Sequence, residues 1–399
     1  MQRRSNILRL GFRLGASALL ALTAGVSCTK KNQDDQIKIG VFGPFTGGSA
    51  PMGLSMRNGV QIAIDEANAA GGVLGKKFVM VDRDDEAKNE RGGQIMQEFL
   101  DKEKVVAVLG PINTGVANAS SRYANERKVP MLINVSAGAK VNELFAEFPE
   151  NYVFHFVAND DVQADMIVTE GIDVAKFKKP ALLCDDTNYG QNGREKMEAV
   201  LAKKGVKPVY IGKFKIKDTD MTAQLQQAKA AGADVILAYG IGPELAAISN
   251  SMERVSYKVP MIASWTAAMS NYVNNASKNG NGTLMPQTFI EDAPKTEVGK
   301  KFLESYRAKF NEKPIASAVS AAQGYDSMMV LKRAIEQAGS LEGPKIKAAL
   351  EDLSASYEGV TGSYAKPFSK TDHEAIKSVN VQMGLVKDGA VVGKSAAAK

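Results

Sequence analysis

Residues 37–82 read IKIGVFGPFTGGSAPMGLSMRNGVQIAIDEANAAGGVLGKKFVMVD. This stretch contains a short β-branched run at 37–42, a long helical pattern at 56–70 and a second short run at 78–82. A strand that is followed by a helix of this length and then by another strand indicates a right-handed crossover between parallel strands. The stretch therefore predicts an α/β fold with a parallel sheet that is covered by helices on both faces.

The alternation of strand and helix continues beyond this stretch and starts again after a loop near Phe156. In the first series we expect helices at 92–102 and 113–126 and a strand at 105–109. In the second series we expect strands at 180–184, 206–214, 235–239 and 261–263, with helices at 190–203, 221–231 and 243–254. Two series predict two doubly wound parallel-sheet lobes, and a mature chain of roughly 370 residues is long enough for two cores.

The C-terminal third departs from this alternation. Helical patterns occupy 298–310, 316–338 and 345–353, whereas 359–364 and 379–385 favour antiparallel strands, with a turn at Asp388 and Gly389. The chain is therefore expected to cross back between the lobes, because the last segment is too poor in apolar runs to form a third core. The expected division is 37–156 plus about 287–353 for lobe 1, 157–286 plus about 354–393 for lobe 2, and 394–399 for a flexible tail.

The first 28 residues have the pattern of an export signal. Four arginines precede an apolar segment at 16–26, which is too short for a mature membrane span and ends in Ser27 and Cys28. The polar run that follows resembles the region after a bacterial lipoprotein cleavage site, so that 1–27 would be removed, Cys28 would carry lipid and 28–36 would form a tether. Cleavage after Ser27 without lipidation is the other interpretation, since Gly25 stands where the lipoprotein signal usually has leucine. We expect a lipid-anchored protein of the periplasm or cell surface, or alternatively a soluble periplasmic one.

Composition excludes several classes of protein. Loss of the four signal arginines leaves 46 basic residues against 44 acidic ones, so the mature chain lacks the positive charge of a nucleic-acid-binding protein. Besides Cys28 the chain has only Cys184, which lies in an apolar run and is expected to be buried in a strand, so no disulfide is predicted. Two histidines and two cysteines, widely separated, also predict no structural metal site and no cofactor.

Enzyme signatures are missing from the sequence. It contains no G-x-S-x-G, G-x-x-x-x-G-K-[ST] or H-E-x-x-H motif. Of the two histidines, His155 is expected to be a satisfied structural or pocket-lining residue, and His373 is expected to be solvated. Adjacent carboxylates are expected to cap helices or to lie in solvated turns rather than to act in acid–base catalysis; they are Asp84 and Asp85, Asp160 and Asp161, and Asp185 and Asp186. We therefore expect a protein that is not an enzyme.

Seven segments carry a resemblance to a known family, in this order along the chain. They are 39–47 (IGVFGPFTG), 59–75 (GVQIAIDEANAAGGVLG), 82–85 (DRDD), 108–111 (VLGP), 130–133 (PMLI), 186–190 (DTNYG) and 323–326 (QGYD). Together they resemble the type I periplasmic solute-binding proteins of the branched-chain amino acid group. The resemblance implies two lobes joined by a three-segment hinge, a small-molecule ligand in the interlobe cleft, a monomeric state and the membrane permease of an ABC importer as partner.

The expected ligand site lies beyond the carboxyl ends of the strands, where helix N-termini present unpaired N–H groups. Asn113 and Thr114 follow one such strand, and their polar groups could cap the next helix or turn into the cleft. The resemblance places a ligand-binding hydroxyl at Thr114. It also implies that Ser136 and Ala137 face the same ligand carboxylate.

Two departures from the family bear on the ligand. Gly138 stands where amino acid binders usually carry a second hydroxyl, and Trp265 stands where they place the acidic residue that holds the ammonium group. Because an indole cannot neutralise an ammonium, the preferred ligand is expected to be a carboxylate without an amino group, unless Asp186 or Glu244 supplies the charge. Simple core packing is the other interpretation of Trp265.

Further contacts are expected around the ligand. Met52 would add an apolar wall, and closure would bring Tyr189, Ile241 and Trp265 of lobe 2 over the solute. We expect a receptor that delivers a small amino acid, aromatic acid or aliphatic acid to an ABC importer. A sensing subunit for a membrane signalling protein and an exported enzyme on the same fold are the alternatives.

Overall fold

A computed structural model describes residues 36–138, 140–143 and 148–397. The expected signal peptide and Cys28 lie outside the described residues. The described residues form two separate sheets and one short two-stranded ribbon. This confirms the α/β class with two predominantly parallel sheets.

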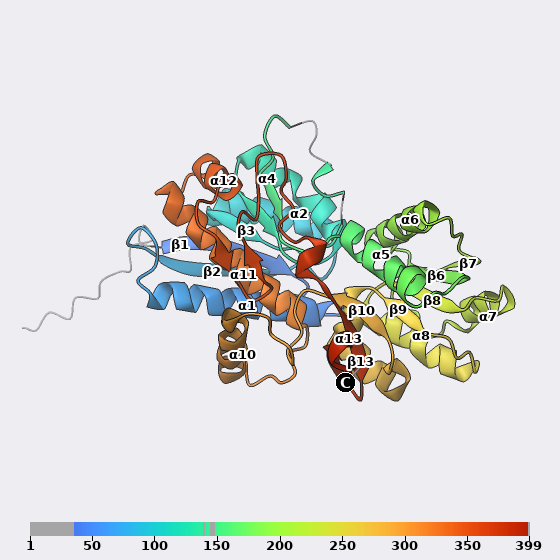
Figure 1. Ribbon diagram of the computed structural model, residues 1–399. Coiled ribbons are helices and arrows are strands. Elements are labelled where there is room, and N and C mark those ends of the chain that lie inside the picture. Colours follow the sequence, from blue (N-terminus) through green and yellow to red (C-terminus); the bar gives the residue numbers. More distant parts are fainter. Residues whose placement is uncertain (1–35, 139, 144–147, 398–399) are drawn as a thin grey trace, which may run out of the picture. The chain divides into compact units, whose positions relative to one another are not determined.

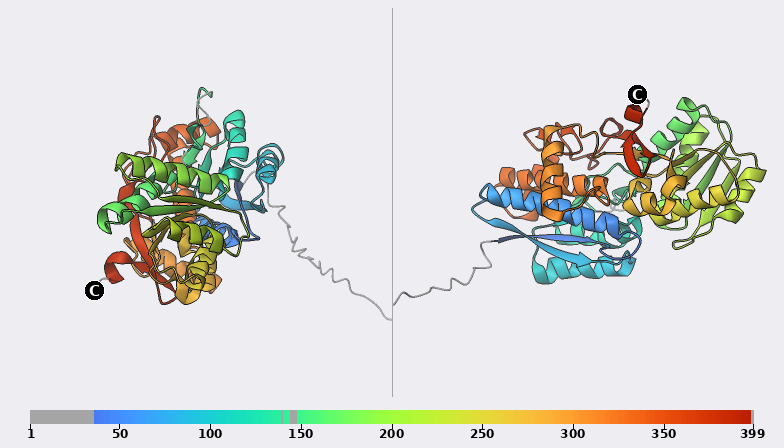
Figure 2. Two further views of the ribbon diagram at one scale, coloured as in Figure 1. Left: turned by 90° about the vertical axis from the view of Figure 1, so that its right-hand side faces the viewer. Right: turned by 90° about the horizontal axis from the view of Figure 1, so that it is seen from below.

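The first sheet has five parallel strands in the order β2-β1-β3-β4-β5. Its strands are β1 (Gln36–Gly43), β2 (Lys77–Asp84), β3 (Ala107–Leu109), β4 (Met131–Ile133) and β5 (Val153–His155). The connecting helices are α1 (Ala50–Ala69), α2 (Asn89–Gln97) with a π-helical extension (Glu98–Glu103), α3 (Thr114–Ser120) and α4 (Arg122–Arg127). Helices lie on both faces of this sheet (Figure 2), and we call the sheet with its helices lobe 1.

The C-terminal third returns to lobe 1 as α10 (Glu297–Phe310), α11 (Ala318–Ala338) and α12 (Gly343–Glu351). Helices α1 and α11 lie side by side (Figure 1), and two glycines explain how closely they pack. A Cβ atom on Gly59 would lie 2.0 Å from the Ala321 carbonyl oxygen, and one on Gly324 would lie 2.5 Å from the Met56 carbonyl oxygen. Both positions therefore need glycine, because any side chain would push the two helix backbones apart.

The second sheet has seven strands in the order β14-β13-β10-β9-β8-β6-β7, and we call it with its helices lobe 2. Its strands are β6 (Pro180–Asp185), β7 (Tyr210–Phe214), β8 (Val235–Tyr239), β9 (Met261–Ala263), β10 (Leu284–Gln287), β13 (Gln382–Lys387) and β14 (Ala390–Gly393). Its main helices are α5 (Asp160–Thr169), α6 (Asn188–Lys203), α7 (Thr222–Ala230), α8 (Gly242–Arg254) and α9 (Ser270–Ala276). Strand β13 is antiparallel to both of its neighbours.

Two local predictions for lobe 2 are confirmed. Cys184 is fully buried in β6. The turn between β13 and β14 contains Asp388 at φ 50° and Gly389 at φ 76°, which are the positive values that a tight hairpin turn requires.

Three segments of the chain cross between the sheets, at 156–159, 288–296 and 377–381. The last crossing lies further along the chain than the expected division, which gave all of 354–393 to lobe 2. Residues 357–376, which include the ribbon of β11 (Tyr357–Glu358) and β12 (Ser363–Tyr364), contact lobe 1 instead. The Tyr357 hydroxyl donates to Asp326 of α11 at 2.7 Å, and the His155 amide of β5 donates to the His373 carbonyl at 2.8 Å.

The expectation that His373 is solvated was wrong. The residue is 8% exposed, and its ring stacks on Phe154 with 4.1 Å between centroids. Its Nδ1 lies 2.7 Å from the Val153 carbonyl oxygen and its Nε2 lies 3.1 Å from Glu351. The polar neighbours of His373 in the sequence concealed this position, because burial here depends on the return of the chain to β5.

Candidate functional site

A cleft of about 830 Å³ is lined by both lobes. Its lining comes from 46–49, 86–90 and 113–115 of lobe 1 and from 186–189, 191–192, 195, 216–217, 241 and 244 of lobe 2. The expected ligand residues Asn113, Thr114, Asp186, Tyr189 and Ile241 are all among them. The volume is within the range of small-molecule sites.

Thr114 and Ser136 form a buried pair of hydroxyl groups. Thr114 is 1% exposed and Ser136 is fully buried, and the Ser136 Oγ lies 3.4 Å from the Thr114 Oγ1. Gly138 packs against this pair, since a Cβ atom at that position would lie 2.4 Å from the Thr114 Cγ2. A side chain at position 138, such as the second hydroxyl residue of amino acid binders, would therefore overlap the Thr114 methyl group in this chain.

Asn113 occupies the N-cap position of α3 but makes no side-chain capping bond. Its amide Nδ2 donates to the Ser49 Oγ at 3.3 Å, and its Oδ1 is buried without a hydrogen-bond partner among the described residues. Thr114 is the first helical residue and not the cap. The capping interpretation of these two residues is therefore not supported, and both line the cleft.

An aromatic pair from lobe 2 is connected through Asp160 to the turn that follows Ser136. The rings of Tyr189 and Tyr239 are 4.7 Å apart, and the Tyr239 hydroxyl donates to Asp160 at 2.7 Å. The Asp160 amide in turn donates to the Ala137 carbonyl at 2.8 Å. Burial raises the pKa of Tyr189 well above its usual value, so its hydroxyl is neutral.

Sequence reasoning missed Asp160, which it assigned with Asp161 to a cap or a solvated turn. Asp160 is fully buried, whereas the Asp161 side chain is 57% exposed. The sequence held one usable signal, because Asn159 is a strong N-cap residue and does cap α5 by accepting from the Val162 amide. A residue at the first helical position after such a cap does not itself cap the helix, and Asp160 accepts from the Tyr239 hydroxyl instead.

Lobe 2 also brings carboxylates to the cleft. Asp186 and Glu244 line it, and Glu244 is only 4% exposed. One Glu244 oxygen accepts from the Lys217 amide at 2.7 Å, and the other is buried without a partner among the described residues. Burial raises the pKa of Glu244. The expectation of a ligand without an amino group depended on the absence of such acids, so it has lost its basis.

Four expected ligand residues are not part of the cleft lining. Ser136 and Ala137 are 0% and 1% exposed and follow β4, and the other two lie elsewhere. Met52 is in α1 rather than in a loop, is 2% exposed and does not line the cleft. Trp265 is 6% exposed, and its carbonyl accepts from the side chain of Gln287, the last residue of β10, at 2.9 Å. It lines a different cavity, of about 650 Å³, beside Met269.

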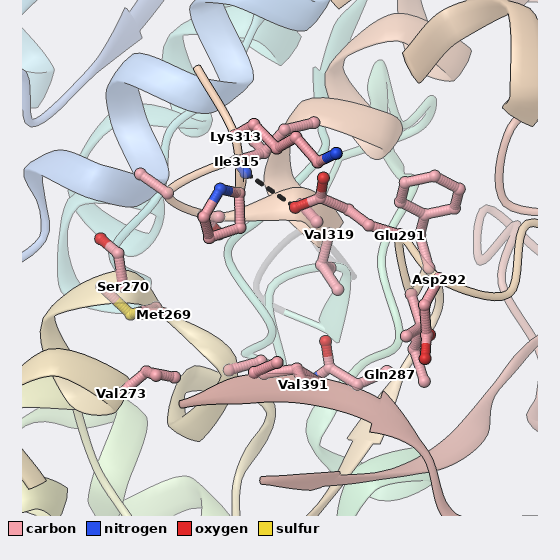
Figure 3. Close-up of a pocket in the computed structure, with 18 of the residues that line it drawn as sticks. Met269, Ser270, Val273, Gln287, Glu291, Asp292, Lys313, Ile315, Val319 and Val391 are labelled. Carbon is pink, nitrogen blue, oxygen red and sulfur yellow. Dashed lines mark hydrogen bonds between the residues drawn. The ribbon is translucent and has the colours of Figure 1, made fainter. Parts of the chain in front are cut away.

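That second cavity is mostly apolar. Figure 3 shows Val319 and Val391 facing it, and Glu291 accepting from the Ile315 amide at 2.7 Å. Glu291 also pairs with Arg307 at 2.9 Å. The position of Trp265 next to this cavity favours a packing role at the crossing over direct contact in the cleft.

A buried ion pair holds the turn that carries Ser136. His155 is fully buried, with its Nε2 2.5 Å from the Ser136 carbonyl oxygen and its Nδ1 2.8 Å from Glu374. Because both ring nitrogens face acceptors, both must donate, and the ring is an imidazolium. Burial opposes the charge, but the charge and hydrogen bond of Glu374 outweigh it and raise the pKa of His155. This confirms the structural role expected for His155.

Two further findings concern the described residues as a whole. Within 36–138, 140–143 and 148–397, no group of His, Cys, Asp and Glu is suited to a metal ion. In the same part of the chain, no helix has the length and apolar character needed to cross a membrane.

Comparisons with known proteins show the family of this chain. A family model described as periplasmic binding protein matches residues 36–390. A Leu/Ile/Val-binding protein homolog of Brucella melitensis is 27% identical over 344 residues, which cover 86% of this chain and 90% of the relative.

Two solved structures are similar as well. The leucine-binding protein LivK of Thermotoga maritima has a TM-score of 0.79 at 26% identity and covers 90% of this chain and 97% of its own. The branched-chain amino acid transporter substrate-binding protein LivJ of Streptococcus pneumoniae, in complex with isoleucine, has a TM-score of 0.79 at 26% identity over 89% of this chain and 97% of its own. These relatives are binding proteins and not enzymes. The chain therefore belongs to the periplasmic binding protein family, as a type I protein of the branched-chain amino acid-binding group.

Proposed function

We propose that this protein is the extracytoplasmic solute-binding component of an ABC importer and that it binds a small carboxylate-bearing solute in the cleft. The observation that carries the proposal is the buried hydroxyl pair of Thr114 and Ser136, next to a cleft lined by Tyr189 and Ile241 of the other lobe. Hydroxyl groups that are withdrawn from water bind a carboxylate with charge-assisted hydrogen bonds. The isoleucine in the LivJ complex is a solute of this class.

The proposed cycle is a hinge closure driven by the solute. The carboxylate binds lobe 1 first at Thr114 and Ser136, and Tyr189 and Ile241 then cover the solute. Contacts between the lobes support this: the Asn271 amide donates to the Gly48 carbonyl at 2.8 Å, and the Ser270 amide donates to the Ala316 carbonyl at 2.9 Å. A solute shifts the hinge equilibrium by the difference between its affinities for the open and closed forms.

The proposal includes a membrane anchor. Cys28 and the polar residues after it support lipidation, with residues 28–36 as the tether. An anchored receptor would keep the solute close to the permease that accepts it.

Thermal-shift and native mass spectrometric screening of the purified mature protein tests the proposed ligand class. The panel holds amino acids, aromatic acids, short-chain acids and the neutral amides of each. We expect at least one carboxylate to bind one-to-one, while its amide binds far more weakly. Binding of the amides alone, or of none of the carboxylates, would contradict the proposal.

A further inference from the structure

The charges along the cleft are unevenly distributed. Its lining contains five carboxylates and two lysines: Glu86, Glu90, Asp186, Glu195, Glu244, Lys88 and Lys217. Lys88 pairs with Glu86 at 2.6 Å, and Lys140 outside the lining pairs with Glu195 at 2.9 Å. In the described part of the chain, Glu90, Asp186 and Glu244 form no salt bridge. The cleft therefore offers an excess of negative charge to whatever enters it.

Three buried oxygen atoms in this lining have no hydrogen-bond partner among the described residues: the Asn113 Oδ1 of lobe 1, and the Tyr189 hydroxyl and Glu244 Oε2 of lobe 2. The tyrosine hydroxyl can donate its own hydrogen, whereas the amide oxygen of Asn113 and the carboxylate oxygen of Glu244 only accept. A buried acceptor without a donor is costly, and a buried carboxylate oxygen is more costly than an amide oxygen. Two such atoms in one cleft indicate that a ligand supplies the donors.

The loop at 46–49 lies next to Asn113 and next to Pro243, the residue before Glu244. Asn113 donates to Ser49 of this loop at 3.3 Å. A Cβ atom on the adjacent Gly48 would lie 3.7 Å from the ring of Pro243, the residue before Glu244. The two acceptors thus come from opposite lobes; Asn113 contacts this loop directly, and Glu244 follows a residue that lies beside it.

A structural role for Glu244 explains only part of its position. The carboxylate lies in the first turn of α8, where negative charge is favourable, and one of its oxygens accepts from the Lys217 amide. That bond leaves the second oxygen unexplained. The backbone amide of Asp160 donates to the Ala137 carbonyl, but the residue is fully buried, does not line the cleft and accepts from the Tyr239 hydroxyl. One amino group next to the carboxylate neutralises one acid, whereas the lining holds three acids that form no salt bridge among the described residues, so Glu244 is available for a second cationic group.

We propose that the solute carries a distal cationic group, an ammonium or guanidinium, that binds between Asn113 and Glu244 while its carboxylate binds at Thr114 and Ser136. This inference rests on the proposed function for the position of the carboxylate. The class of solute is an amino acid with a basic side chain. The side chain of a branched-chain amino acid has no donor for either acceptor.

Calorimetric titrations of the mature protein test this inference. The probes are L-arginine, L-lysine and L-ornithine, with L-norleucine as the apolar control of similar length and agmatine as arginine without its carboxylate. We expect a basic amino acid to bind roughly 10-fold or more tightly than norleucine. Glu244→Gln, which keeps one oxygen for the Lys217 amide, should remove most of that preference. Glu253→Gln, an exposed carboxylate on the same helix outside the cleft lining, should leave it unchanged.

Each outcome separates the two proposals. Norleucine binding as tightly as every basic amino acid, or a preference that survives Glu244→Gln, would overturn the distal cation and leave the proposed function standing. Agmatine binding as tightly as arginine would support the cation and overturn the carboxylate site. Binding of none of the probes would overturn the inference.

Discussion

Gly138→Ala perturbs the candidate site at a single point. The new methyl group would lie 2.4 Å from the Thr114 Cγ2 and 3.2 Å from its Oγ1. Carbon atoms pack at about 3.5–4.0 Å, so the first contact is too short by more than about 1 Å. Gly138 does not have a positive φ angle, so the backbone itself accepts alanine. The threonine side chain must rotate, or the turn at 136–138 must move.

The cost follows from this overlap. Overpacking of a buried site lowers the free energy of unfolding by about 1–3 kcal/mol. Rotation of Thr114 also displaces a hydroxyl from the proposed carboxylate site, which should weaken ligand binding by roughly 5-fold to 150-fold. Thr114→Ser removes the Cγ2 atom and keeps the hydroxyl, so the double variant Thr114→Ser with Gly138→Ala should recover much of both losses.

Thermal unfolding and calorimetry on the four members of this double-mutant cycle measure the coupling. The titrant is the tightest ligand from the screen. We expect the two substitutions to be strongly non-additive, with the double variant closer to wild type than Gly138→Ala alone. Wild-type stability and affinity in Gly138→Ala, or additive effects in the double variant, would refute the reasoning.

Three further predictions concern the buried charges and the anchor. The His155 pKa is raised by Glu374, so the stabilising contribution of the ion pair is present at low pH and is lost as pH rises through that pKa. In chemical denaturation, His155→Gln should therefore lower the free energy of unfolding more at about pH 6 than at about pH 9. An equal loss of free energy at both pH values would contradict the imidazolium. Burial raises the Asp85 pKa to about 7, which makes the folded state less stable as pH rises from about 4 towards 7. Asp85→Asn should therefore raise the unfolding midpoint at about pH 8 but not at about pH 4, and a midpoint raised at about pH 4 but not at about pH 8 would contradict the raised pKa. Cys28→Ser should move the protein from the membrane to the soluble fraction without changing ligand affinity, and a wild-type protein already wholly soluble with an unmodified N-terminus would rule out the anchor.

Local patterns were sufficient to predict most of the fold. The β-branched runs at 235–239 and 261–263 coincide with β8 and β9, because these strands are buried on both faces and read as continuous apolar segments. The expected helix at 113–126 is divided at Ser121 into α3 and α4. Strand β10 and helix α5 were missed, since Leu284–Gln287 contains Pro286, which argues against a central strand, and Asp160–Thr169 does not separate its apolar and polar residues with a clear helical period.

The candidate site was harder to predict because it is assembled from distant segments. Asn113 and Thr114 could be found, since a polar pair directly after a buried strand marks the carboxyl edge of a sheet. The role of Asp160 depends on its hydrogen bond with Tyr239, which is distant in the sequence. The unpaired oxygen of Glu244 depends on burial by neighbouring elements, and local sequence patterns do not show which elements are neighbours. Trp265 was misplaced because alignment to a family position does not say where a much larger side chain will pack.

The central claim is that a carboxylate solute binds at Thr114. Calorimetric titration of the mature wild-type protein and of Thr114→Ala with the tightest carboxylate from the screen tests it most directly. We predict a one-to-one complex for the wild type and an affinity that is lower by roughly 5-fold to 150-fold for the variant, with an unfolding midpoint close to that of wild type. An unchanged dissociation constant in a folded Thr114→Ala protein would contradict the account.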